Sequence, residues 1–371
     1  MEKMRVKCLL PVVAGEEEIE QTIGVDELRG WVPVDAITRG GRPFLRWMEV
    51  LGDTFSEPFF HQTVEHLRAQ KPAVRELLTD LDALLQLEKI TDALSPTGFI
   101  FHGSRCGSTL VSNACRSLSG ALMVTEAQVI DKIADQPIPA DHHSSEAKLL
   151  FNKLLLRGAV SALGQRRTGA EQYYFIKFAC FGILQYEKIK SIWPDVPCVF
   201  IYRDPLEVIA SSMKTRPQWM LDEKNLAQVA STIGISDEEF RIIGPEEFCS
   251  RVLGKLYTKA AELTDSGLML IRYEELSTDK ILEIIDLFGI QPTPLEVEEI
   301  RAVSKLYSKD PIPARLFTRD AEDKRASVSR LAREMAERWA MGPFQRLNEQ
   351  HEKLQHSTSP CLVKMNEEVN R

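Results

Sequence analysis

The chain has 371 residues and a mass of 42.0 kDa, and its 44% hydrophobic and 27% charged residues are typical of a soluble globular protein. Its 46 Lys and Arg against 54 Asp and Glu give a formal net charge of −8 and a pI of about 5.6. This balance argues against a broad cationic surface, so we expect neither nucleic acid nor a membrane as a partner. The composition does not exclude a local anion-binding site.

Hydropathy and cysteine usage indicate the compartment. No apolar run approaches the roughly 20 residues that a membrane-spanning helix needs. The apolar stretch at 8–15 is interrupted by Pro11 and followed at once by Glu16, unlike a secretory signal. The 7 cysteines are scattered, without a C-x-x-C pair or a Cys/His cluster that would suggest zinc. We therefore expect a cytoplasmic protein with reduced thiols and no metal.

Residues 1–95 differ from the rest of the chain. The Gly-Gly-Arg-Pro sequence at 40–43 has the chemistry of a turn, which favours an appended N-terminal region of mixed and partly irregular structure. Helical spacing of apolar residues predicts one helix that starts within 53–58 and passes through Leu67, and another over 73–87.

Residues 96–349 read as an α/β domain. Four short apolar runs are typical of buried parallel strands: 98–102, 173–179, 198–202 and 268–271. The stretches between them are long enough for right-handed helical crossovers, which predicts a doubly wound parallel sheet. A last helix is expected over about 326–349, followed by a polar and frayed C-terminal tail over 350–371.

The most informative segment is FIFHGSRCGSTLV at 99–111. It predicts a strand, a tight loop with Gly103 and Gly107, and a helix that opens with Ser108 and Thr109. Glycines let backbone N–H groups approach an oxyanion, and the helix N-terminus adds partial positive charge, so the segment indicates a phosphate-type cradle. An ordinary strand-to-helix turn is the alternative. Ser108 stands where the Walker A lysine would be, so Mg-ATP chemistry lacks its charge clamp.

A second strand-to-helix segment is VFIYRDPLEVIASS at 199–212. Asp204 can cap its helix and Pro205 suits the first turn. Arg203 falls at the carboxyl end of the strand, where open α/β sheets bind ligands. Ser211 lies two helical turns beyond Asp204 on the same face, so Arg203 and Ser211 are candidates to hold one phosphate. A surface ion pair of Arg203 is the alternative.

Together these segments resemble the sulfotransferase family that uses 3′-phosphoadenosine 5′-phosphosulfate (PAPS). SRCGSTL at 104–110 is similar to that family's 5′-phosphosulfate loop, and RDPLEVIAS at 203–211 is similar to its 3′-phosphate motif, in the same order. LIRYEEL at 270–276 is similar to its late strand and turn, and 317–325 to its C-terminal basic segment. The resemblance covers 96–345 and implies a three-layer, P-loop-like sulfotransferase fold.

The resemblance also implies a reaction. A sulfuryl group would pass from PAPS to a hydroxyl or amine of a small-molecule acceptor without a metal, leaving adenosine 3′,5′-bisphosphate (PAP). It assigns two sets of donor-binding residues: Ser104, Arg105, Cys106, Gly107, Ser108 and Thr109 for the 5′ end, and Arg203, Ser211, Lys324 and Arg325 for the 3′ end. Arg105 is assigned to electrostatic stabilisation, because a guanidinium keeps its proton at neutral pH.

The position of the general base differs from that in one branch of the family. Animal cytosolic members use a histidine in a strand that here reads FIKFA at 175–179 and holds none. This favours Glu126, in MVTEAQV, where other branches place a catalytic glutamate; a plain helix-start carboxylate is the alternative. Lys177 could reach the sulfonate or the acceptor, or be a solvated strand-end lysine. His142 and His143 are the other candidate bases.

Other functions stay open at this point. A P-loop phosphotransferase would fit the loop but lacks the Walker lysine, and a non-catalytic nucleotide-binding module would need no base. Neither the acceptor nor the oligomeric state follows from the sequence. The N-terminal aromatics Trp31, Trp47, Phe59 and Phe60 either cover the acceptor or belong to the core.

Overall fold

The protein is described from a computed structural model. Its described residues are 5–10, 19–50, 52, 55–70, 75–134, 144–221, 223–263, 266–305, 325 and 328–368. The chain divides into two compact units: unit 1 is Met1–Ile100, Thr109–Pro197 and Ile281–Arg315, and unit 2 is Phe101–Ser108, Cys198–Lys280 and Leu316–Arg371. The boundary runs through strand β6 (Gly98–His102).

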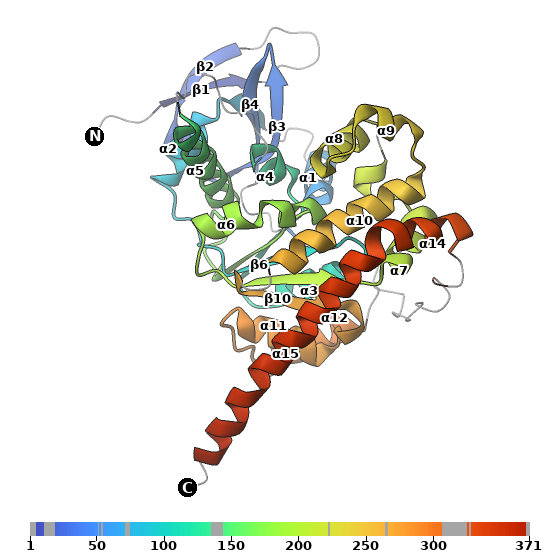
Figure 1. Cartoon of the computed structure of the whole chain (residues 1–371). Coiled ribbons are helices and arrows are strands. Elements are labelled where there is room, and N and C mark those ends of the chain that lie inside the picture. Colours follow the sequence, from blue (N-terminus) through green and yellow to red (C-terminus); the bar gives the residue numbers. More distant parts are fainter. Residues whose placement is uncertain are drawn as a thin grey trace. The chain divides into compact units, whose positions relative to one another are not determined.

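The N-terminal part of unit 1 is an antiparallel sheet in the order β2-β1-β5-β4-β3 (Figure 1). Its strands are β1 Arg5–Leu10, β2 Ile19–Gly24, β3 Trp31–Arg39, β4 Arg42–Glu49 and β5 Glu76–Thr79. The β3–β4 hairpin turns at Gly40 and Gly41, whose φ values of 53° and 76° suit glycine. Trp47 is fully buried, and its indole N–H donates to Thr79 Oγ1 at 2.9 Å. The described residues of this region thus contain a regular sheet that the sequence did not predict, and its character as an appended region stays a prediction.

Two helices were expected in the same region. The first is confirmed as α1 (Phe60–Gln70). The second, over 73–87, is wrong at Glu76–Thr79, which form β5, and is confirmed where α2 (Asp82–Glu88) begins; residues 73 and 74 lie outside the described part of the chain. The adjacent leucines at 77 and 78 are compatible with the residue spacing of a helix and with that of a strand. Their pairing with β4 makes them part of a strand.

The second sheet has five parallel strands in the order β10-β9-β6-β8-β7, which confirms the α/β fold class. Its strands are β6, β7 Ala121–Thr125, β8 Tyr173–Lys177, β9 Cys198–Tyr202 and β10 Leu268–Arg272. The four expected strands are confirmed. The fifth strand, β7, was not predicted from its short apolar run. β7 and β8 lie on one side of β6, and β9 and β10 lie on the other. The loop after β6 is therefore at the topological switch point, where such sheets bind ligands.

Helices connect these strands. Unit 1 contains α4 Gln128–Ala134, α5 Ser145–Leu163, α6 Tyr186–Ile192 and α12 Pro294–Ser304. Unit 2 contains α7 Pro205–Lys214, α8 Glu223–Ile233, α9 Asp237–Ile242, α10 Pro245–Glu262, α14 Arg330–Ala336 and α15 Gly342–Glu368. Two helices cross the boundary: α3 Ser108–Arg116 and α11 Thr278–Leu287. In the described part of the chain, no helix has the length and apolar character to cross a membrane.

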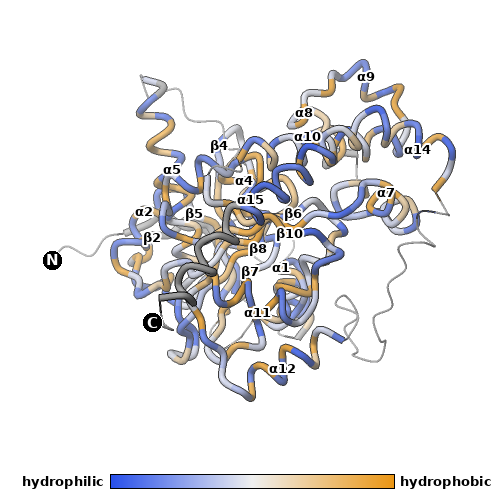
Figure 2. The backbone as a smooth tube through the Cα atoms, turned by 60° about the horizontal axis from the view of Figure 1, so that its bottom comes forward, coloured by the Kyte–Doolittle hydropathy of each residue, from blue (hydrophilic) through white to orange (hydrophobic). Residues whose placement is uncertain are grey.

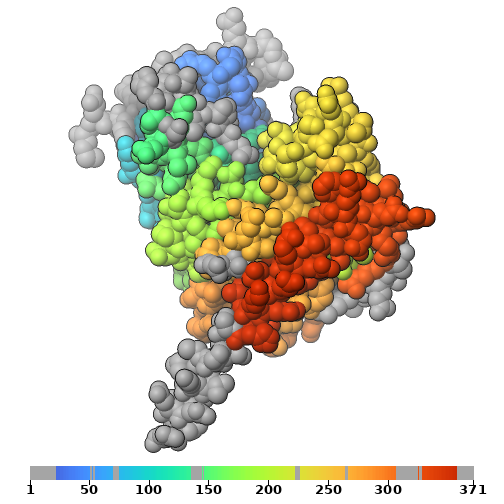
Figure 3. Space-filling model, in the orientation of Figure 1, coloured from blue at the N-terminus to red at the C-terminus, as the bar shows by residue number. Residues whose placement is uncertain are grey.

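The C-terminal helices pack within unit 2. α15 runs along α10 (Figure 1), and the described side chains of α14 and α15 form one continuous red band in Figure 3. A Cβ on Gly254 of α10 would lie 2.2 Å from the Trp339 carbonyl oxygen, so glycine permits this approach. The helix expected to end near residue 349 instead continues to Glu368. Its continuation is held by the buried His351, which pairs with Glu275 at 2.8 Å.

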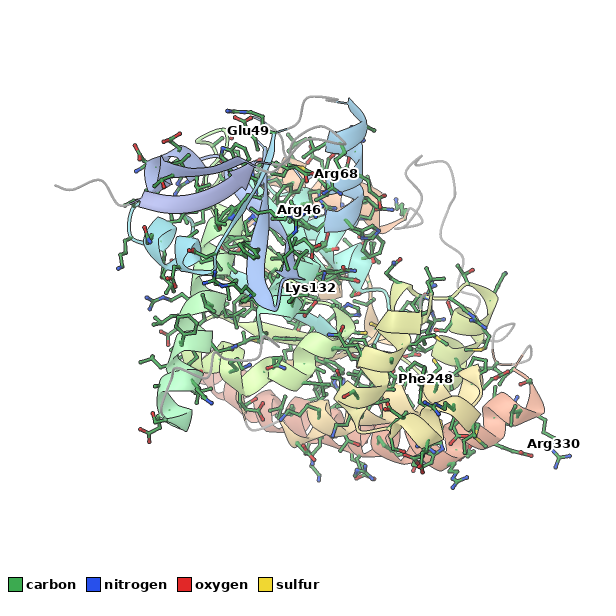
Figure 4. The ribbon with its side chains drawn as sticks, turned by 90° about the horizontal axis from the view of Figure 1, so that it is seen from above. Arg46, Glu49, Arg68, Lys132, Phe248 and Arg330 are labelled. Carbon is green, nitrogen blue, oxygen red and sulfur yellow. The ribbon has the colours of Figure 1, made fainter. Side chains whose placement is uncertain are left out.

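The helices between α7 and α10 have their own small core. Phe248 of α10, labelled in Figure 4, packs against the rings of Trp219 and Phe240 with centroids 6.0 and 5.8 Å apart. Along α8, hydrophobic and hydrophilic residues alternate (Figure 2), and Val229 and Ala230 are buried. This pattern is typical of a helix with one packed face.

Ion pairs connect strands of the antiparallel sheet with each other and with helices of unit 1. Arg46 on β4 and Arg68 on α1, both labelled in Figure 4, lie 3.8 and 2.7 Å from the carboxylate of Glu76. Lys132 of α4 pairs with Asp35 of β3 at 2.5 Å. The first 95 residues therefore share a compact unit with α/β elements, and the domain boundary near residue 95 stays a prediction.

Glu296 ties the start of α12 to the turn after α3. Its Oε1 accepts the Ser119 backbone N–H at 2.7 Å, and its Oε2 accepts the Thr293 backbone N–H at 2.7 Å. These backbone donors lower the pKa of Glu296 from its ordinary 4.5 to about 2.

We expect Glu296 to stabilise the fold above pH 4.5 and to lose this contribution as the pH falls toward 2, because its pKa is lower in the folded chain. Glu296→Gln should lower the free energy of unfolding at neutral pH by about 1 to 2 kcal/mol. It should also flatten the dependence of stability on pH between those values. Urea unfolding at several pH values measures both effects, and an unchanged acid slope in the variant would contradict this role.

Candidate active site

The loop after β6 has an uncommon backbone conformation. Ser104, Arg105 and Gly107 have positive φ values of 63°, 49° and 82°. Left-handed residues close together can form a concavity of backbone N–H groups that suits an anion. Two of the three are not glycine, and such residues persist only where surrounding structure holds them. This is the backbone geometry that the predicted phosphate cradle requires.

Side chains of β6 and the loop anchor this conformation inside unit 2. The Ser104 N–H donates to His102 Nδ1 at 3.1 Å, and the Cys106 thiol donates to the Ile201 carbonyl at 3.0 Å. Burial acts to raise the pKa of Cys106, but the hydrogen bond and charge of His102 and nearby backbone N–H groups outweigh it and lower the pKa. The Cys106 side chain faces the core, so any contact of this residue with a ligand would be through its backbone.

Tyr273 joins the two segments that were predicted to bind phosphates. It follows β10 in a single turn, η5 (Tyr273–Glu275). A Cβ on Gly107 would lie 3.0 Å from its ring atom Cδ2 and 2.8 Å from Leu276 Cδ1, so the loop backbone packs directly on this turn. The Arg203 guanidinium lies 3.8 Å from the centroid of the same ring. One aromatic side chain therefore touches both segments.

Arg203 and Arg325 share a buried carboxylate. Arg203 Nε donates to Glu207 Oε2 at 2.6 Å, and an Arg325 terminal nitrogen lies 2.8 Å from Glu207 Oε1. The same Arg325 nitrogen lies 3.2 Å from Asp204. Two cations and two anions thus form a group without net charge, rather than the exposed ion pair that was the alternative for Arg203. Glu207 was not singled out from the sequence, although its i,i+4 spacing from Arg203 on α7 was a usable signal.

The other predicted residues of the nucleotide site have different surroundings. The Arg105 guanidinium donates to the Thr215 carbonyl at the C-terminal end of α7, where a helix favours positive charge. Ser211 is half-buried on α7. Lys324, His142 and His143 lie outside the described residues, so their roles stay predictions.

In unit 1 the structure brings Glu126 and Lys177 into contact. Glu126 directly follows β7, and Lys177 is the last residue of the neighbouring strand β8, so both lie at the carboxyl edge of the sheet. Lys177 Nζ lies 2.7 Å from Glu126 Oε1 and 3.4 Å from Thr109 Oγ1. The Glu126 N–H donates to the Lys177 carbonyl at 2.7 Å, and Glu126 has a φ of 52°.

Burial differs sharply between the two partners. The Lys177 side chain is 1% exposed, which excludes a solvated strand-end lysine, whereas the Glu126 side chain is 27% exposed. The pair therefore offers a partly accessible carboxylate backed by a buried ammonium. Among the residues that the structure describes, no cluster of His, Cys, Asp and Glu is suited to hold a metal ion.

The comparisons with known proteins give limited information. No family model and no curated protein matches the chain. Among solved structures, the chain is similar to a sulfotransferase from Alicyclobacillus acidocaldarius at 13% sequence identity and a TM-score of 0.40, covering 70% of this chain and 96% of that chain. The functional proposal therefore depends on the residues of this chain.

Gly107→Ala should disturb the loop more than a substitution that adds backbone strain alone. Gly169→Ala is a matched control, because Gly169 also has a φ of 82° but open space around its Cα. We expect the control to cost about 1 to 2 kcal/mol from strain and Gly107→Ala to cost about 1 to 3 kcal/mol more from overpacking. Urea unfolding measures both variants, and equal losses would contradict the contact with Tyr273.

Proposed function

We propose that this protein is a PAPS-dependent sulfotransferase that transfers a sulfuryl group to a hydroxyl of a small-molecule acceptor. The observation that carries this proposal is the Tyr273 ring, which touches both Gly107 and Arg203. Gly107 and Arg203, one residue from each of the segments that resemble the 5′-phosphosulfate and 3′-phosphate motifs, are thereby packed on one ring within unit 2. A nucleotide with anionic groups at both ends matches two such segments.

The residues present fit such a donor. The loop after Ser104 and the N-terminus of α3 are proposed to supply backbone N–H groups for the 5′-phosphosulfate, and the hydroxyls of Ser108 and Thr109 add to them. Arg203, Ser211, Arg325 and Lys324 are proposed for the 3′-phosphate. The Arg325 side chain is 48% exposed, so it can turn from Asp204 and Glu207 toward a bound phosphate more readily than the buried Arg203.

The proposed reaction is an in-line transfer. The acceptor oxygen forms a bond to sulfur, the bond between sulfur and the phosphate oxygen breaks, and the acceptor proton passes to the Glu126 carboxylate. Lys177 orients that carboxylate, and it also reaches the Thr109 hydroxyl. Arg105 would leave the Thr215 carbonyl to stabilise the charge that grows on the departing phosphate.

Sulfur-labelled PAPS separates this proposal from its competitors. We expect label to enter an alcohol or phenol from a small acceptor panel, with no loss of rate in EDTA and no phosphoryl transfer from Mg-ATP. Label that binds to the protein but reaches no acceptor would favour a binding module. Phosphoryl transfer from Mg-ATP without sulfuryl transfer would favour a P-loop phosphotransferase, and either result would overturn the proposal.

Glu126→Gln tests the proposed base. The amide keeps the size of the side chain but cannot take the proton, so turnover on a hydroxyl acceptor should fall by about 10² to 10⁴-fold while PAP affinity stays near that of the wild type. Glu65→Gln, at an exposed position of α1, is the control. Steady-state rates and calorimetry with PAP measure the two effects. Should Glu126→Gln keep most of its activity, the base must be sought first at His142 and His143.

A further inference from the structure

The segment before α1 contributes an aromatic side chain to the Lys177–Glu126 pair. The centroid of the Phe59 ring lies 5.0 Å from Lys177 Nζ, within the range of a cation–π contact. The buried ammonium is thus contacted by the carboxylate of Glu126, the hydroxyl of Thr109 and the Phe59 ring. All four residues belong to unit 1. The N-terminal region therefore supplies part of the surroundings of the proposed base.

The backbone that carries Phe59 is anchored by α3. Arg116 donates from Nε to the Phe55 carbonyl at 3.1 Å and from a terminal nitrogen to the Glu57 carbonyl at 3.0 Å. The Arg167 guanidinium lies 3.7 Å from the centroid of the Phe55 ring. These contacts on residues two and four positions before Phe59 fix the approach of the chain to the ion pair.

Phe59 also pairs with a neighbouring ring. The planes of Phe59 and His61 are 21° apart and their centroids are 5.7 Å apart. Rings in direct face-to-face contact are about 3.5 Å apart, so these two rings lie side by side with an offset, as aromatic pairs prefer. Both side chains are half-buried. By contrast, three aromatics of the same region are core residues: Trp31, Trp47 and Phe60 are 6%, 0% and 3% exposed.

We propose that Phe59 and His61 form an acceptor subsite for a planar aromatic ring that carries the reacting hydroxyl. This inference rests on the proposed function. An aromatic acceptor can pack against the Phe59 and His61 rings while its hydroxyl approaches Glu126, beside the same ammonium. The chemistry of the base agrees, because a carboxylate is a weak base and a phenol, with a pKa of about 10 as in tyrosine, gives up its proton to it more readily than an aliphatic alcohol.

The consequence concerns the role of residues 1–95. This region folds into unit 1 and places the Phe59 ring at the proposed base, so under this proposal it helps to select the acceptor. Replacing Phe59 should change which acceptors are used and leave the donor affinity as it is.

The test compares 2-naphthol with its saturated analogue decahydro-2-naphthol, titrated calorimetrically into the full chain saturated with PAP. The wild type should prefer 2-naphthol. Phe59→Leu and His61→Leu should each lower the affinity for 2-naphthol by about three- to tenfold and change the affinity for the saturated analogue by less than about twofold. Phe44→Leu is the matched control, because Phe44 is a half-buried phenylalanine on β4, and it should leave both affinities unchanged.

The outcomes separate this inference from the proposed function. If PAP itself does not bind, the sulfotransferase proposal fails and the subsite fails with it. If PAP binds but the two naphthols bind equally, or Phe59→Leu and His61→Leu behave like Phe44→Leu, the subsite is overturned and the sulfotransferase proposal stands. Should Phe59→Leu fail to fold by circular dichroism, His61→Leu decides alone, and unchanged 2-naphthol affinity in that variant overturns the inference.

Discussion

The contact of the Tyr273 ring with Gly107 and Arg203 is the constraint on which the proposed nucleotide site depends. The loop backbone can pack on the ring because Gly107 has no side chain, and its φ of 82° suits glycine. Arg203 stacks on the ring, and its backbone carbonyl accepts the Tyr257 hydroxyl at 2.6 Å. Gly107 and Arg203, which are far apart in the sequence, are thereby held against one side chain.

Buried charge in this protein is balanced by specific partners. Glu207 is fully buried between Arg203 and Arg325, and Lys177 is 1% exposed beside Glu126. Removing one member of such a pair would leave an uncompensated charge in a poorly solvated place, which is strongly unfavourable. The fold therefore holds the buried Arg203 and Lys177 in defined positions through their carboxylate partners.

The features predicted correctly from the sequence are those that depend on a local residue pattern. Four of the five parallel strands follow from continuous apolar runs, and the loop follows from its glycines and the helix after it. The antiparallel N-terminal sheet was not predicted, because its strand pairing involves partners distant in sequence, as β5 shows by pairing with both β1 and β4. The Tyr273 contacts and the position of Phe59 beside Lys177 are also long-range, so spacing alone could not reveal them.

The most direct test of the central claim is phosphorus NMR of PAP titrated with the protein. If the loop at 104–108 and Arg203 are held together by Tyr273 as one binding site, the 5′ and 3′ phosphorus resonances should both move, with the same dissociation constant. A shift confined to one phosphorus, or two shifts that saturate at different protein concentrations, would contradict the account.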